Sequence, residues 1–221
     1  MHFGCISARE IVARSLDRAG ADAFVRQLCW RDFYHQVTLA FPPIARADYR
    51  PRGDRWRVDR RALDAWKAGR TGYPIVDAAM RQLAREGFMH NRARLIAASF
   101  LVKDLGVDWR RGAEHFLDLL VDGDIANNSG NWQWVAGTGN DTRPNRVFNP
   151  IAQAKRFDPE GVYVRRYVPE LAAIRDGRVH EPWLLDPKTR HMLHYPNPII
   201  DHARAATRFL ARRRATNGRR R

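Results

Sequence analysis

The residues best suited to chemistry lie together at positions 122–134, in the order DGDIANNSGNWQW. These thirteen positions hold two carboxylates, four amides and two indoles. Amides both donate and accept hydrogen bonds, so with a paired acid they can hold a polar, uncharged heterocycle. Indole rings beside such a heterocycle can stack on it or carry an electron. A simpler interpretation also stands for Asp122 and Asp124, because Asp-Gly-Asp is good turn chemistry.

Two segments upstream add aromatic and basic side chains. They read WRDFY at 30–34 and WKAGRTGYP at 66–74. The first falls within a helical pattern, with Gln27 one turn before Trp30. It could simply be an amphipathic helix that packs its aromatics inward, and a buried tryptophan most often belongs to a core. The chain nevertheless has seven tryptophans, which is a high number for 221 residues.

Helical periodicity dominates the elements that must position these residues, and strand alternation is scarce, so the sequence predicts an all-α fold. Residues 130–150 are rich in Gly, Asn and Pro and predict a long loop of the kind that often carries a site. More helix is expected around 165–175, followed by a Pro-rich segment and a final Arg-rich helix or tail. A capping box at Ser7–Glu10 predicts a first helix that ends near Gly20, and Asp59 predicts the cap of a helix that ends near Lys67. The other early helices are expected from Asp22 to Phe41 and over 74–87, 91–105 and 109–121.

Composition and charge set the broad class. The chain is 44% hydrophobic with a net charge of +15, which favours a polyanionic partner such as nucleic acid. Eight arginines and no acid follow position 201, so we expect one domain over 1–200 and a basic tail over 201–221. Cys5 and Cys29 form no metal-binding pattern, and no metal is expected. With no apolar run near the ~20 residues of a membrane span and no secretory signal, a soluble cytoplasmic monomer is expected.

The three segments together resemble the flavin-binding domain of the photolyase and cryptochrome family, over about Phe3 to Pro198. They are most similar to class I cyclobutane pyrimidine dimer photolyases. The resemblance implies a helical flavin domain, FAD as the cofactor in its reduced form, and UV-damaged DNA as the partner. The implied activity is that of a deoxyribodipyrimidine photo-lyase, in which light drives an electron from FAD to a dimer flipped out of the DNA.

The resemblance also assigns roles around the flavin. It implies that Asp122 pairs with Arg94 and that Asn128 faces the flavin N5, where an amide oxygen favours the reduced ring. It implies an electron chain in which Trp132 is nearest the flavin, Trp109 is intermediate and Trp66 lies at the surface. The residues expected to bind the cofactor are Asp122, Gly123, Asp124, Asn128, Arg94 and Arg31.

A second set is expected to bind DNA and the lesion. Trp30 would be the stacking surface for an extruded base, and Arg146 and Asn149 would contact backbone phosphates. The complete set is Gln27, Trp30, Arg31, Tyr34, Asn91, Arg92, Leu95, Trp134, Arg146 and Asn149.

The sequence departs from the family pattern in three ways. The N-terminal α/β domain that carries an antenna chromophore and the Ser/Thr-rich loop that holds the FAD phosphates are both missing. The chain is therefore expected to begin partway through the family's flavin domain, to lack an antenna site and to bind FAD less tightly. Gln27 stands where a glutamate is usual and Leu95 where a methionine is common. Glutamine at the position of Gln27 also occurs in the branch of (6-4) photolyases and animal cryptochromes. The (6-4) repair enzymes have a histidine where this chain has Asn91, so the asparagine favours repair of cyclobutane dimers.

Two other interpretations remain open from the sequence. One is a photoreceptor of the cryptochrome type, although only about 20 basic residues follow the matched region, where such proteins usually have a long tail. The other is a flavin-free helical remnant that binds DNA, which the positive charge and the missing phosphate loop would support.

Overall fold

The computed structural model describes residues 1–218, and its regular elements are helices. Within this range the one β-bridge joins Arg57 to Val107. The predicted all-α class is therefore confirmed. The elements are α1 Ala8–Ser15, α2 Ala21–Ala40, η1 Pro42–Ala45, α3 Arg60–Lys67, α4 Pro74–Glu86, α5 Asn91–Ser99, η2 Phe100–Leu105, α6 Trp109–Leu119, α7 Ile125–Ala136, α8 Pro150–Phe157, α9 Val162–Tyr167, η3 Pro169–Leu171, η4 Gly177–His180, η5 Pro182–Leu184, α10 Pro187–Leu193 and α11 His202–Gly218.

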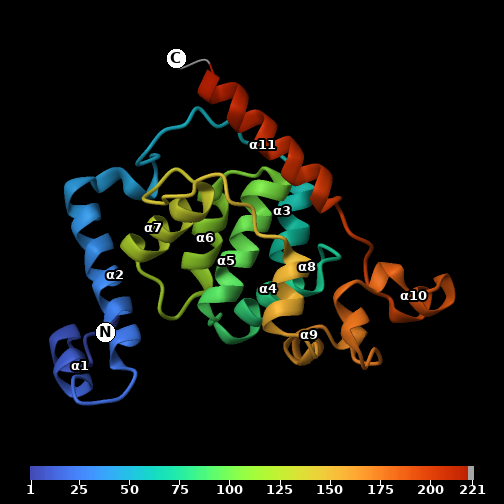
Figure 1. Cartoon of the computed structure of the whole chain (residues 1–221), viewed down its shortest axis with the longest axis horizontal. Helices are drawn as coiled ribbons and strands as arrows, with labels where there is room; N and C mark the ends of the chain where they lie inside the picture. Colours follow the sequence, from blue (N-terminus) through green and yellow to red (C-terminus); the bar gives the residue numbers. More distant parts are fainter. Residues whose placement is uncertain (219–221) are drawn as a thin grey trace.

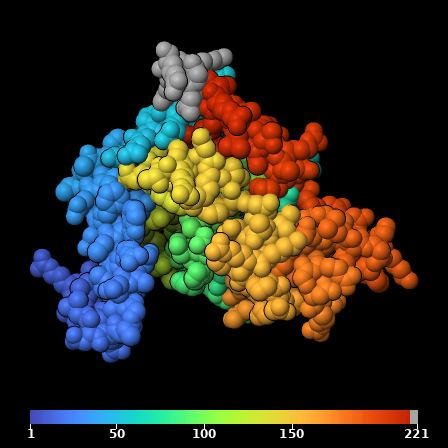
Figure 2. All heavy atoms as spheres, in the orientation of Figure 1, coloured from blue at the N-terminus to red at the C-terminus, as the bar shows by residue number. Residues whose placement is uncertain are grey.

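Helices α4 and α5 form the centre of the molecule (Figure 1). Helix α4 contacts α9 on one side and α5 on the other, while α6 packs on α7. The apolar side chains of α4, such as Val76, Met80 and Leu83, are fully buried. Helix α2 lies along α7, and α1 and α2 project from one side of the molecule, in blue in Figure 2.

Several helix ends follow from local sequence. The side chain of Ser7 accepts a hydrogen bond from the Glu10 backbone, and that of Asp59 accepts one from Ala62, as expected of N-caps. Gly87 ends α4 in a left-handed conformation, with a φ of 61°. The first helix ends at Ser15 and not near Gly20, and the second begins at Ala21, one residue before the predicted Asp22.

The Thr71-Gly72-Tyr73-Pro74 segment has a structural role. The buried carboxylate of Asp77 accepts hydrogen bonds from the backbone and hydroxyl of Thr71, at 2.7 and 2.6 Å, and from the Gly72 backbone. These contacts fix the connection into α4, against which the site helices pack.

The long loop predicted over 130–150 is wrong in its first part. Helix α7 continues to Ala136, so the irregular connection covers only residues 137–149. The Asp124 side chain caps α7 by accepting from Asn127, and the helix is packed closely against α2. Helix α8 was not predicted; Asn149 caps it by accepting from Ile151 and Ala152. The helix expected around 165–175 is α9 followed by the short turn η3.

The segment set apart as a basic tail is helical in its described part. Its apolar residues Ala205 and Phe209 are buried, and α11 packs against η2, a π-helical extension of α5. Residues 219–221 of the predicted tail lie outside the described residues.

Candidate functional site

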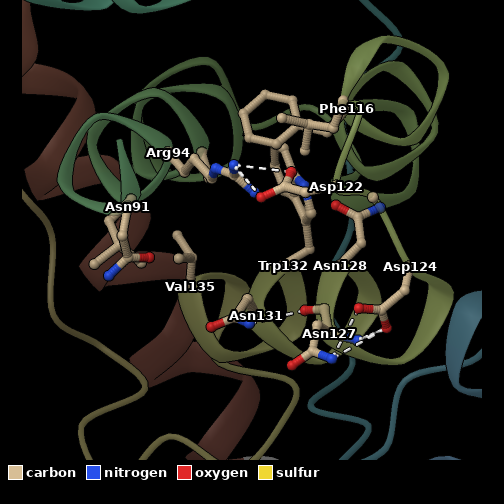
Figure 3. Close-up of a pocket in the computed structure, with 14 residues that line it drawn as sticks. Asn91, Arg94, Phe116, Asp122, Asp124, Asn127, Asn128, Asn131, Trp132 and Val135 are labelled. Carbon is tan, nitrogen blue, oxygen red and sulfur yellow. Dashed lines mark hydrogen bonds and ion pairs between the residues drawn. The ribbon is translucent and has the colours of Figure 1, made fainter. Parts of the chain in front are cut away.

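An inner pocket with a cavity volume of about 90 Å³ opens between α5, α6 and α7 (Figure 3). Its lining combines amides and an ion pair with apolar side chains. The lining residues are Asn91, Arg94, Leu95, Ala98, Phe116, Leu120, Asp122, Gly123, Asp124, Asn127, Asn128, Asn131, Trp132 and Val135.

Arg94 and Asp122 form the predicted pair at the rim of this pocket. One terminal nitrogen of Arg94 lies 3.1 Å from both carboxylate oxygens of Asp122, and its Nε donates to the Met89 carbonyl at 2.7 Å. The second contact fixes the guanidinium, so the pair holds Asp122 in one position beside the pocket (Figure 3).

Asn128 presents an acceptor to the pocket. Its Nδ2 donates to the Ala113 carbonyl on α6 at 2.7 Å. A carbonyl can only accept, so this contact fixes which side of the amide is nitrogen. The Oδ1 then points toward Asp122 and the pocket interior, as Figure 3 shows.

Asp124 is held by its role as a helix cap. Both of its carboxylate oxygens accept from the Asn127 amide, at 3.1 and 2.9 Å, and Oδ1 also accepts from the Asn127 backbone. Asn127 and Asn131 line the pocket although neither was among the predicted site residues. Their membership of the same amide-rich segment was the signal that could have identified them.

An outer pocket adjoins the inner one between α2 and α7. Four residues line both pockets: Asn91, Leu95, Asn127 and Asn131. A molecule in one pocket would therefore lie next to a molecule in the other. The lining of the outer pocket is completed by Gln27, Trp30, Arg31, Tyr34 and Trp134, all of them predicted site residues.

The wall that α2 contributes has an exposed and a buried aromatic ring. Trp30 is 45% exposed and lies 6.0 Å from Tyr34, which is 3% exposed. Burial raises the pKa of Tyr34 to about 12, further from the physiological range than the ordinary value of a phenol. Tyr34 rests on Gly130 of α7, where an added Cβ would come within 2.2 Å of its ring. The close approach of α2 to α7 therefore requires glycine at this position.

The other predicted DNA-binding residues lie around these pockets. The guanidinium of Arg146 is 5.8 Å from the Trp134 ring, and that of Arg92 is 4.6 Å from the ring of Phe157. The Asn149 side-chain oxygen is engaged in capping α8. Arg31, predicted for both cofactor and DNA, lines the outer pocket and pairs with Asp32.

The prediction that Trp66 lies at the surface is wrong. Trp66 is fully buried. Its indole donates to the Ala97 carbonyl at 3.0 Å and stacks on the ring of Phe116. It is also a direct neighbour of Trp132, with 6.1 Å between ring centres. Trp109, likewise buried, donates to the Asp48 carboxylate.

Trp56 is a partly exposed tryptophan that the sequence analysis did not single out. It precedes Arg57, whose backbone pairs with that of Val107, two residues before Trp109. The spacing of residues in the sequence does not predict that Trp56 is partly exposed, because this exposure depends on how the segment before α3 packs.

Comparison with known proteins decides the family. The family model described as the FAD binding domain of DNA photolyase matches residues 24–215. The chain belongs to this family. The FAD-binding domain is 62% identical over 211 residues to the deoxyribodipyrimidine photo-lyase of Streptomyces griseus, covering 95% of this chain and 46% of that protein. It is 46% identical over 204 residues to that of Escherichia coli strain K12, covering 90% and 43%.

Solved structures agree with this assignment. A bacterial class III photolyase from Agrobacterium tumefaciens matches with a TM-score of 0.87 and 41% identity, over 96% of this chain and 46% of that one. A cryptochrome from Synechocystis matches with a TM-score of 0.88 and 35% identity, over 95% and 47%. The expected family and helical FAD-binding fold are confirmed, and the chain spans less than half the length of these relatives.

No helix within 1–218 is long and apolar enough to span a membrane. In the same range, His, Cys, Asp and Glu side chains form no group of three that could hold a metal ion.

Proposed function

We propose that this FAD-binding domain serves light-driven DNA repair, with the inner pocket holding the flavin and the outer pocket holding a cyclobutane pyrimidine dimer turned out of the DNA. Bound FAD in its reduced form would supply the electron that splits the dimer. The observation that supports this most directly is the wall shared by the two pockets, because electron donor and acceptor would lie side by side across Asn91 and Leu95.

The residues present fit a flavin ring in the inner pocket. A flavin offers both hydrogen-bond donors and acceptors, and the pocket answers with the Asn128 oxygen and the Arg94–Asp122 pair. The Asn128 oxygen could accept from an N5–H, while one N–H of the amide already donates to Ala113. The apolar floor of Phe116, Trp132 and Val135 suits the ring faces.

The outer pocket fits an extruded dimer. Half-exposed Trp30 offers a flat face for stacking, and the amides of Gln27 and Asn91 can donate to pyrimidine carbonyls. Arg31 in the pocket and Arg146 at its rim place positive charge where DNA phosphates would pass. Because Gln27 and Asn91 are both neutral, this site would recognise the lesion without proton transfer.

Electron supply to the flavin would run through tryptophans. Trp132 lines the inner pocket, Trp109 lies on the neighbouring α6, and partly exposed Trp56 is the candidate for the surface end. Trp66 takes an interior place beside Trp132 in this proposal.

The test uses the purified chain with added FAD. An absorption spectrum should show bound flavin, illumination with a reductant should bleach it, and the product should repair an oligonucleotide that contains a single thymine dimer under near-UV light. Binding and photoreduction without repair of the dimer would contradict the proposed activity. Absence of bound flavin would instead support a flavin-free DNA-binding role.

A second candidate function is flavin-based light sensing. The similarity to a cryptochrome structure, with a TM-score of 0.88, is the observation that favours it. The repair assay separates the two, since a sensor would photoreduce its flavin and leave both cyclobutane and (6-4) lesions intact.

A further inference from the structure

Lys103 is a buried cation that the proposed repair chemistry does not use. It belongs to the π-helical turn η2 and is 2% exposed. Its ammonium group donates to the carbonyl oxygens of Pro144, at 3.3 Å, and of Arg146. The Phe209 ring of α11 covers it from the other side, with the nitrogen 5.4 Å from the ring centre. Lysines are almost never fully buried unless they are paired, so this placement calls for a function.

Both carbonyl oxygens belong to the 137–149 connection at the rim of the outer pocket. The side chain of Arg146 is exposed and stands 5.8 Å from the rings of Trp134 and Phe148. Lys103 therefore holds the backbone of Arg146 from inside, while the guanidinium faces outward beside a residue of the outer pocket.

We propose that Lys103 is a positioning residue for DNA binding, which holds Arg146 at the rim of the outer pocket through the Arg146 carbonyl and loosens that hold when the pH falls. This inference rests on the proposed DNA-binding function of the outer pocket. It adds a residue that touches neither flavin nor DNA.

The direction of the pH effect follows from burial. Loss of solvent lowers the pKa of Lys103 to about 7, from its usual 10.5. Opening the connection would expose the amine to water and return its pKa toward the usual value. The open connection therefore binds the proton more tightly, so proton uptake favours opening. Around the amine, the charged groups are Asp54, Asp104, Asp141, Arg146 and Arg213, of which the two arginines lower the pKa further and the acids oppose them.

The first experiment tests the hold without DNA. Hydrogen exchange of the amides in 137–149, corrected for intrinsic rates, should show more protection at about pH 8 than at about pH 6 in the wild-type chain. Lys103→Met should remove this difference, because its side chain cannot titrate. The matched control is Lys188→Met, which removes the same charge from an exposed position on α10 and should keep the wild-type behaviour. A pH-independent wild type, or an unchanged difference in Lys103→Met, would overturn the proposal.

The second experiment tests the consequence for DNA. At constant ionic strength, the affinity for a dimer-containing oligonucleotide should rise up to about ten-fold between about pH 6 and about pH 8. The open state keeps its proton over this range, whereas the closed state loses its proton above about pH 7. Loss of positive charge from other groups would weaken binding over this range, so the expected sign is distinctive.

Two variants separate the possible failures. Arg146→Ala changes an exposed side chain, so it should fold, bind DNA less tightly and lose the rise with pH. DNA binding whose pH dependence survives in both Lys103→Met and Arg146→Ala would refute the role of Lys103. Complete absence of DNA binding together with the expected hydrogen-exchange pattern would refute the proposed function. It would still support the contact by which Lys103 holds the connection over 137–149.

Discussion

Asn128 illustrates how a single contact can determine what a pocket offers. Its nitrogen donates to Ala113, which turns its oxygen toward the pocket, where it can accept from a bound ring. We expect Asn128→Ala to bind FAD but to let the reduced flavin reoxidise in air about ten-fold faster. A change of this size corresponds to the free energy of roughly one hydrogen bond. Flavin absorbance after photoreduction measures this rate. Gln36→Ala, an exposed amide on α2, serves as the control, and equal rates in both variants would remove the N5 assignment.

Trp30 should contribute most of the lesion's stacking energy. Base stacking on an aromatic side chain is worth about 1–3 kcal/mol. Trp30→Ala should therefore weaken binding of dimer-containing DNA on the order of ten-fold or more in a fluorescence anisotropy titration. Phe24→Ala removes a ring of similar exposure from the same helix, at 50% against 45%, and should leave the affinity near that of the wild type. Similar losses in the two variants would point to nonspecific apolar contact.

The electron path predicts a different pair of effects. Trp132→Phe and Trp56→Phe should both slow photoreduction of the flavin, because each removes an oxidisable ring from the path. Repair by enzyme that has been reduced chemically should stay near the wild-type level in both variants. Flavin absorbance recorded during illumination measures the rate of photoreduction. An oligonucleotide repair assay measures the repair activity. Unchanged photoreduction in Trp56→Phe would place the surface end of the path elsewhere.

Residue types that line the inner pocket could be predicted from the sequence, whereas the exposure of side chains could not. The Arg94–Asp122 pair was predicted through a resemblance that rests on locally ordered residues, and the geometry agrees. The position of Trp66 was predicted wrongly because its burial depends on Ala97 and Phe116, which are far away along the chain. No spacing within 66–74 encodes those contacts.

At the scale of elements, the close packing of α2 on α7 depends on Gly130. Gly130→Ala would bring a methyl group to 2.2 Å from Tyr34, so the two helices must separate. We expect a loss of about 1–3 kcal/mol in the free energy of unfolding, as for other overpacked sites, together with weaker dimer binding at the pocket between these helices. Urea unfolding checks the stability. Gly177→Ala, where the nearest atom would be 3.9 Å away, should cost little, and equal costs would exclude the steric explanation.

The helices themselves were predictable where local signals decide them. Ser7, Asp59 and Gly87 mark their helix ends by side-chain chemistry or backbone conformation that acts within one turn. The low helix propensity of Asn, Ser and Gly predicts a loop where the second half of α7 lies. Its stability comes from the Asp124 cap and from packing against α2, and the packing is a contact between segments far apart in the sequence.

At the scale of the whole molecule, Lys103 should shape the pH dependence of stability. With a pKa near 7 in the folded chain and near 10.5 when unfolded, the unfolded chain binds more protons between these values. The cost of burying the ammonium is therefore complete below about pH 7 and shrinks as the pH rises. Relative to Lys103→Met, the wild type should gain stability between about pH 7 and about pH 9 in urea unfolding. Parallel pH curves for the two proteins would contradict a buried, titrating amine.

In the proposed function, each of the two pockets holds a different ligand. Four of the five residues that line only the outer pocket come from α2, whereas the inner pocket is built from α5, α6, α7 and the turn between the last two. The residues that line only the outer pocket can therefore be changed without replacing a side chain that lines the inner pocket. Grafting the sequence of Ala21–Ala40 from a relative with another lesion preference is a direct route to retargeting this domain, because the inner pocket would keep every one of its lining side chains.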